Sequence, residues 1–115
     1  MGLKTSIREF GDVTILDLRG RSTIEGESEL LSGRLKKVIA KGARKLLLNL
    51  QDLTQIDTTG VSVIIENFVS LRKKGGELKL LNLTKKVHDL LQITKLYTVF
   101  DVKDDEASAV KSFNH

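Results

Sequence analysis

The 115-residue sequence predicts an α/β fold in which a mixed central sheet of about five strands is combined with about four helices. Three observations support this prediction. Two strand-like segments at the N-terminus are joined by a turn and form a hairpin. Apolar strand-like runs then alternate with amphipathic helical segments, which is typical of parallel strands with right-handed crossovers. Repeats, low-complexity tracts and linkers are absent, so we expect residues 1–115 to form a single domain.

The hairpin is predicted from alternation of side chains around a turn. Residues 3–10 have weak strand character, and Gly11-Asp12 is a typical turn pair. In the following segment, residues 13–18, apolar side chains recur with the period of two expected for a strand. Gly20 is expected to end this strand.

A first helix and a buried strand follow the hairpin. Ser22 and Glu25 have the spacing of a capping box, which predicts a helix start at this point. The apolar stripe of this helix comprises Leu31, Leu35, Val38 and Ile39. Gly42 follows as a stop signal. The run 46–50 is almost continuously apolar, which indicates a strand buried on both faces.

The second half of the sequence repeats this alternation. We expect the second helix to bury a stripe made of Val61, Ile64, Ile65, Phe68 and Val69. A strand at 78–81 precedes a third helix, which Thr84 caps and which buries Val87, Leu90 and Leu91. Residues 96–102 are expected to contain a short last strand. The acidic residues 104–106 then begin a last helix with Ala107, Val110 and Phe113 on its apolar side.

Composition argues against most enzyme classes. The chain has no cysteine, and its two histidines, His88 and His115, have no serine or aspartate partner in a known catalytic pattern. Phosphate-binding glycine loops and metal-ligand spacings are also missing. We therefore expect a protein that is not an enzyme, with no catalytic residue, cofactor or metal.

Charge and hydropathy limit the partners. The net charge of +4 is mild, and the basic clusters lack the interleaved aromatic residues that stack on bases, so we expect no nucleic-acid partner. No apolar run approaches the roughly 20 residues of a membrane span, so we expect no membrane insertion. A cytoplasmic location is the default expectation, and the oligomeric state is left open.

The most informative segment is Asp57-Thr58-Thr59-Gly60-Val61, which lies between a strand-like run and a helical one. In open α/β sheets, sites lie at the carboxyl ends of strands, where this segment falls. The simplest interpretation is structural, with Asp57 or Thr58 capping the second helix. Hydroxyls in this position can also bind an anion or accept a phosphate group.

The wider context of this run resembles the STAS domain, the family of bacterial anti-sigma factor antagonists. An apolar strand, a short loop and then Asp-Ser-Ser/Thr-Gly-Leu/Val at a helix start characterise that family, and Leu48 to Val61 has this arrangement. The N-terminal hairpin, the Gly75-Gly76 turn and the segment from Leu81 to Phe100 resemble the family as well, so the resemblance spans nearly the whole chain.

The resemblance implies a phosphorylation switch. An anti-sigma factor that is also a protein kinase would phosphorylate the hydroxyl residue after Asp57, which is Thr58, and a phosphatase would reset it. The unphosphorylated protein would bind the anti-sigma factor and release the sigma factor, thereby regulating transcription. The surface implied for the partner consists of Arg21, Ser22, Thr23, Asp57, Thr58, Thr59, Gly60 and Ser62.

The sequence departs from the family pattern at three places. Thr58 stands in place of the usual serine, Ser62 in place of a small glycine or alanine, and Arg21-Ser22-Thr23 in place of an acidic pattern. An alternative therefore stays open: a non-catalytic STAS interaction subunit of a signalling or ABC-transport assembly, without a phosphorylation switch. In that case Thr58 and Thr59 would serve only as capping and contact residues.

Overall fold

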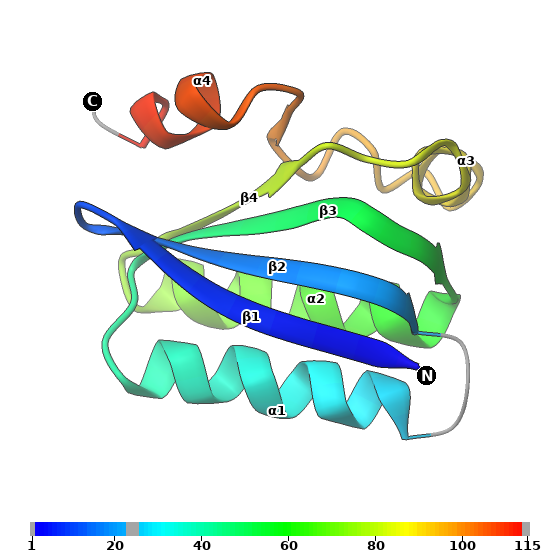
Figure 1. Ribbon diagram of the computed structural model, residues 1–115, viewed down its shortest axis with the longest axis horizontal. Helices are drawn as coiled ribbons and strands as arrows, with labels where there is room; N and C mark the ends of the chain where they lie inside the picture. The colour runs from blue at the N-terminus through cyan, green and yellow to red at the C-terminus, as the bar shows by residue number, and fades with distance from the viewer. Residues whose placement is uncertain (1, 23–25, 114–115) are drawn as a thin grey trace.

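In its described residues, the chain folds into a five-stranded mixed sheet with four helices, as the sequence predicted (Figure 1). The computed structural model describes residues 2–22 and 26–113. Strands follow the order β1-β2-β3-β4-β5 across the sheet; β1 and β2 are antiparallel, and the other neighbours are parallel. The elements are β1 (Leu3–Phe10), β2 (Val13–Ser22), α1 (Glu27–Ala40), β3 (Lys45–Ile56), α2 (Thr58–Lys73), β4 (Glu77–Leu81), α3 (Lys85–Ile93), β5 (Val102–Lys103) and α4 (Glu106–Lys111).

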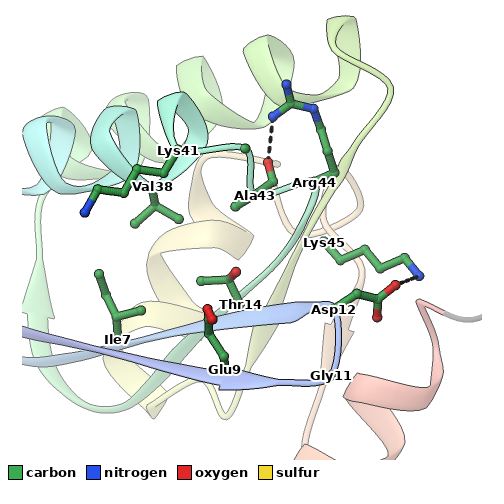
Figure 2. A pocket seen from close by; sticks show the side chains of 11 residues that line it. Ile7, Glu9, Gly11, Asp12, Thr14, Val38, Lys41, Ala43, Arg44 and Lys45 are labelled. Atoms are coloured by element: carbon green, nitrogen blue, oxygen red, sulfur yellow. Dashed lines mark hydrogen bonds and ion pairs between the residues drawn. The ribbon is translucent and has the colours of Figure 1, made fainter.

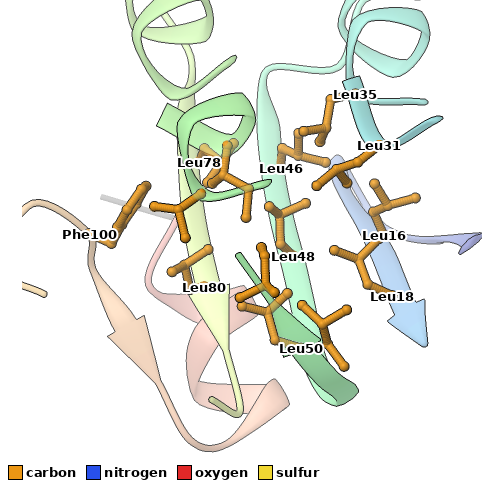
Figure 3. Packing of buried hydrophobic residues seen from close by; sticks show 14 of the residues in the cluster. Leu16, Leu18, Leu31, Leu35, Leu46, Leu48, Leu50, Leu78, Leu80 and Phe100 are labelled. Atoms are coloured by element: carbon orange, nitrogen blue, oxygen red, sulfur yellow. The ribbon is translucent and has the colours of Figure 1, made fainter. Parts of the chain in front are cut away.

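Helices cover both faces of the sheet. Helices α1 and α2 lie side by side on one face, and α4 lies over the other (Figure 1). The main core between the sheet and α1 and α2 is built largely from leucine (Figure 3). Its predicted α1 stripe, Leu31, Leu35, Val38 and Ile39, is buried as expected. A smaller cluster under α4 comprises Val13, Ile15, Leu47, Leu81, Ala109 and Phe113.

The predicted hairpin is confirmed. Phe10 pairs with Val13 across the two-residue turn Gly11-Asp12, and Gly11 has φ of 63°. A positive φ at the first central residue but not at the second, Asp12, indicates a type II′ turn, whose twist matches that of the flanking strands. The turn therefore fixes the register of β1 against β2.

Two predictions about the end of β2 were wrong. The strand continues past Gly20 to Ser22, with a register shift between Gly20 and Arg21. Gly20 adopts φ of 93°, and a Cβ there would lie 2.1 Å from the carbonyl oxygen of Gly2, so this glycine marks an irregularity inside the strand. The capping box also fails, because α1 begins at Glu27 after the N-cap residue Gly26; Thr23, Ile24 and Glu25 lie outside the described residues.

The third strand, β3, is longer than predicted, and the buried stripe of α2 is rotated. Strand β3 runs from Lys45 to Ile56. On α2, Val69 is 43% exposed, whereas Asn67 and Leu71 are buried instead. Asn67 tolerates burial because its side-chain amide donates to the Val63 carbonyl at 2.8 Å.

The C-terminal region departs furthest from prediction. Residues 96–100 form turns, and the last strand is only Val102–Lys103. Leu96, Tyr97 and Phe100 pack against the core from this irregular segment, and the Phe100 ring lies 5.3 Å from that of Phe68, whereas Val99 is exposed. On α4, Ala107 is exposed and Ala109 is buried, which shifts the predicted apolar side.

An ion-pair clamp joins the two ends of the chain. The Arg8 guanidinium donates to Asp17 at 2.6 and 2.8 Å and to Glu106 at 2.7 and 3.2 Å. Asn49 donates to the same Asp17 carboxylate at 2.7 Å. The hydrogen bond from Arg8 holds the pKa of Asp17 below its usual range. The clamp thus ties β1 and β2 to the start of α4.

Candidate functional site

The start of α2 lies at the carboxyl edge of the sheet, where β2 and β3 end together (Figure 1). Ser22 and Ile56, the last residues of these strands, are register partners. The N–H group of Asp57 donates to the carbonyl of Ser22 at 3.2 Å, which extends the β2–β3 pairing by one residue. The end of β2 is therefore fixed directly beside the first turn of α2.

Asp57 is the N-cap of α2, which is one of the two residues, Asp57 and Thr58, that the structural interpretation of the sequence offered for this position. Its backbone is extended, with φ of −102° and ψ of −179°, and its Oδ1 accepts a hydrogen bond from the Gly60 N–H at 2.9 Å. Its carbonyl accepts from the Val61 N–H at 3.1 Å. The carboxylate thus satisfies one of the free N–H groups that every helix start presents.

The hydroxyl residues Thr58 and Thr59 are exposed on the first turn of α2. The first turn contains no acidic residue. Ser62, one turn later, is also exposed and donates its hydroxyl to the Thr58 carbonyl at 2.9 Å. A helix start favours negative charge, so this turn presents accessible hydroxyls in a position that tolerates an anion.

Gly60 is buried because the chain leaves no room for a side chain there. A Cβ at this position would lie 2.6 Å from Cγ1 of Ile56 and 3.1 Å from Oγ of Ser22. The first turn of α2 therefore packs directly against the ends of β2 and β3. The sequence showed the glycine but not these two contact partners.

The comparison with known proteins assigns this arrangement to a family. Residues 4–109 match the STAS domain family. The chain belongs to this family. It is 33% identical to the anti-sigma-B factor antagonist of Bacillus subtilis over 92 residues, which cover 76% of this chain and 84% of the relative.

Solved structures share the fold of this STAS domain. A putative anti-sigma factor antagonist from Thermotoga maritima superposes with a TM-score of 0.87 and 23% identity, over 96% of this chain and 95% of the other. The Bacillus cell fate determinant SpoIIAA in its phosphorylated form gives a TM-score of 0.73 and 18% identity, over 95% and 98% of the two chains.

The STAS domain brings only some of the predicted site residues to its surface. Asp57, Thr58, Thr59 and Ser62 share the first turns of α2, and Arg21 is exposed at the end of β2. The Ser22 side chain is only 1% exposed and lies behind Gly60, so its hydroxyl faces the interior. Within the described part of the chain, that hydroxyl has no hydrogen-bond partner. Thr23 lies outside the described residues.

The surroundings of the STAS site include a basic pocket. A shallow pocket of about 360 Å³ lies at the end of β2 and is lined by the basic residues Lys4, Arg19 and Arg21. Over residues 2–22 and 26–113, no cluster of three or more histidine, aspartate or glutamate side chains could hold a metal ion. In the same residues, no helix is long and apolar enough to cross a membrane.

Proposed function

We propose that this STAS domain is an anti-sigma factor antagonist that binds an anti-sigma factor kinase through the start of α2 and is switched off by phosphorylation of Thr58. The observation that supports this most strongly is the exposed Thr58 hydroxyl at the first residue of a helix whose N-cap is already supplied by Asp57. A kinase can reach this hydroxyl without opening the fold.

The local electrostatics support a switch that changes the surface and leaves the fold intact. A phosphate group adds about −1.5 to −2 charges at neutral pH. The first turn of α2 has no acidic residue of its own, so its N–H groups and helix dipole can stabilise that charge. At a packed interface the same charge would weaken binding by desolvation and repulsion.

The named relatives support the same assignment. The Bacillus subtilis relative is an anti-sigma-B factor antagonist, and SpoIIAA, which shares the fold, has been observed in a phosphorylated form. By this proposal the protein acts in the cytoplasm by binding and has no catalytic activity of its own. A phosphatase would return it to the binding form.

The proposal is tested by phosphorylation in vitro. The purified protein is incubated with ATP and an anti-sigma factor kinase from the same organism, and the modified residue is located by mass spectrometry. We expect one phosphate on Thr58, its loss in Thr58→Ala, and full modification of Thr59→Ala, which removes a neighbouring exposed hydroxyl. Equal modification of Thr58→Ala and wild type would contradict the assignment.

A binding assay distinguishes the switch from a purely structural interaction subunit. We expect Thr58→Glu to bind the anti-sigma factor at least roughly tenfold more weakly than Thr58→Ser, because a charge enters the interface. A stable complex that is indifferent to Thr58→Glu would favour the alternative of a subunit without a phosphorylation switch.

A further inference from the structure

Strand β1 presents a free backbone edge. It is the first strand of the sheet order, so among the strands of residues 2–22 and 26–113 only β2 pairs with it. The Arg21 N–H donates to the Gly2 carbonyl at 3.4 Å, and Phe10 closes the turn opposite Val13. In an antiparallel pair, backbone groups alternate in direction, so these contacts direct even-numbered residues of β1 toward β2. Thr5, Ile7 and Glu9 therefore point their N–H and C=O groups outward.

Two of these outward residues, Ile7 and Glu9, line a groove against α1. Ile7, which is 53% exposed, lines a pocket of about 520 Å³ together with Val38 of α1 and Lys41, the C-cap residue of that helix. Figure 2 shows Lys41 and Val38 on α1 facing Ile7 on β1. The groove thus has an apolar floor beside an open strand edge.

Lys41, which lines this pocket, belongs to a row of cations along one flank of α1. Arg34 and Lys37 precede Lys41 by seven and four residues, so helical periodicity places all three on the same flank of α1. All three are exposed, and none forms an ion pair with another described residue. By contrast, Lys45 at the end of the pocket is paired with Asp12 at 2.6 Å. We call Arg34, Lys37 and Lys41 the α1 cation row.

We propose that the free edge of β1 and the α1 cation row form a docking groove for an extended, acidic segment of a partner protein, which adds to the sheet as a further strand. The outward N–H and C=O groups match the backbone of a peptide, and the cation row matches its acidic side chains. The groove shares no residue with the first turn of α2, so this contact is separate from the proposed switch.

The same geometry disfavours two other occupants. A second copy of the chain paired through β1 would bring two cation rows together, and these like charges would repel. On the β1 side of the pocket, each copy would contribute the acidic residue Glu9. A nucleic acid would find no aromatic ring in the groove to stack on. Phe10 is 63% exposed, but its position in the β1 alternation places it with Arg8 on the face that carries α4.

Amide hydrogen exchange tests the strand addition with a defined probe. The probe is a capped peptide about eight residues long in which glutamate and valine alternate. With the peptide bound, we expect exchange at Thr5, Ile7 and Glu9 to slow by at least roughly tenfold, and Lys4, Ser6 and Arg8 to change little because they already bond to β2. Equal protection of both sets, or of neither, would overturn the proposal.

Peptide variants separate backbone pairing from charge. A peptide methylated on alternate backbone nitrogens keeps its charge but cannot pair with β1, and a lysine–valine peptide keeps the backbone but reverses the charge. We expect both to bind at least roughly tenfold more weakly than the probe. If the methylated peptide bound as tightly as the probe, the contact would be nonspecific charge attraction without backbone pairing, and the proposed docking groove would be refuted.

A matched pair of charge-reversed proteins tests the cation row. The triple variant Arg34→Glu, Lys37→Glu, Lys41→Glu should lose roughly tenfold in affinity for the probe. The control Lys36→Glu, Lys73→Glu, Lys74→Glu has the same change in net charge elsewhere and should stay within about twofold, since exposed charges are screened beyond about 8 Å at physiological salt. Equal losses in both variants would overturn the proposal. So would concentration-dependent protection of Thr5, Ile7 and Glu9 in the protein alone, which would assign the edge to a second copy.

Discussion

Helices α1 and α2 lie side by side on the same face of the sheet, but their first turns are built in opposite ways. The N-cap of α1 is Gly26, which makes no side-chain capping bond, and Glu27 and Glu29 supply negative charge in its first turn. The N-cap of α2 is Asp57, and its first turn contains no acid. The start of α1 therefore carries two carboxylates in its first turn, whereas the start of α2 carries the single carboxylate of its Asp57 cap and has more capacity for an added anion.

The two helices also differ in how closely their glycines are packed. Gly60 in α2 is closed in by Ile56 and Ser22, whereas a Cβ on Gly33 of α1 would have nothing within 4 Å. One glycine is required by close packing and the other is not. The comparison shows that α2 packs tightly against the sheet at Gly60, in the same first turn that exposes Thr58 and Thr59.

The largest expected effect is at Gly60. Gly60→Ala should lower the free energy of unfolding by about 2 kcal/mol, because its Cβ would overlap Ile56 and the packed core resists the shift. Gly33→Ala should raise the free energy of unfolding by about 0.5–1 kcal/mol, because alanine is the better helix former. Urea denaturation measures both. If the two alanine variants changed stability by the same amount, the packing difference between the helices would be refuted.

The next largest effect is expected from the α2 cap. Asp57→Ala should cost about 1 kcal/mol of unfolding free energy, because the Gly60 N–H loses its acceptor. Asp57→Asn keeps an acceptor oxygen and should remain within a few tenths of a kcal/mol of the wild type. Thermal and urea unfolding of the three proteins provide the comparison, and a large loss in the asparagine variant would show that the charge matters more than the hydrogen bond.

A carboxylate placed at Thr58 tests the capacity of α2 for an anion. Thr58→Glu should raise the free energy of unfolding by about 0.3–1 kcal/mol at low salt, because it complements the helix dipole. The gain should shrink as salt is added. A loss of stability would mean that the first turn cannot accept negative charge, and the proposed phosphorylation would then have to disturb the fold.

The smallest effect is expected from the corresponding charge on α1. Glu29→Gln should lower the free energy of unfolding by about 0.3 kcal/mol, because it removes one of the carboxylates of the first turn. Glu66→Gln, in the middle of α2, serves as a control far from a helix start and should change stability less. If both variants changed the free energy of unfolding equally, the helix dipole could not explain the effect of Glu29.

Local sequence patterns predicted most of this fold. The Gly11-Asp12 turn, the α1 stripe and the caps Asp57 and Thr84 were predicted because each depends on residues a few positions apart. The predicted capping of α1 by Ser22 was wrong, because the tertiary pairing of β2 with β3 draws Ser22 into the sheet. Residues 96–100 looked like part of a strand because most of them are apolar, but Leu96, Tyr97 and Phe100 reach the core from an irregular segment and Val99 stays exposed.

In the candidate site, too, some features follow from the local sequence and others depend on tertiary packing. The exposed threonines and the Asp57 cap follow from the order of residues in one short segment. The contact of Gly60 with Ser22 joins residues 38 positions apart and depends on strands packing against a helix, so no local pattern contains it. The burial of Ser22 was missed for this reason.

The clamp between Arg8 and Glu106 has a consequence for how the chain completes its folding. Its two ends lie 98 residues apart in the chain, so almost all of the protein must be synthesised before the contact can form. The first strand to be made then depends on the last helix for one of its two carboxylate partners. Chains truncated before Glu106 should therefore keep the Arg8–Asp17 pair but hold β1 less firmly, leaving the edge of the sheet more open to unintended strand pairing.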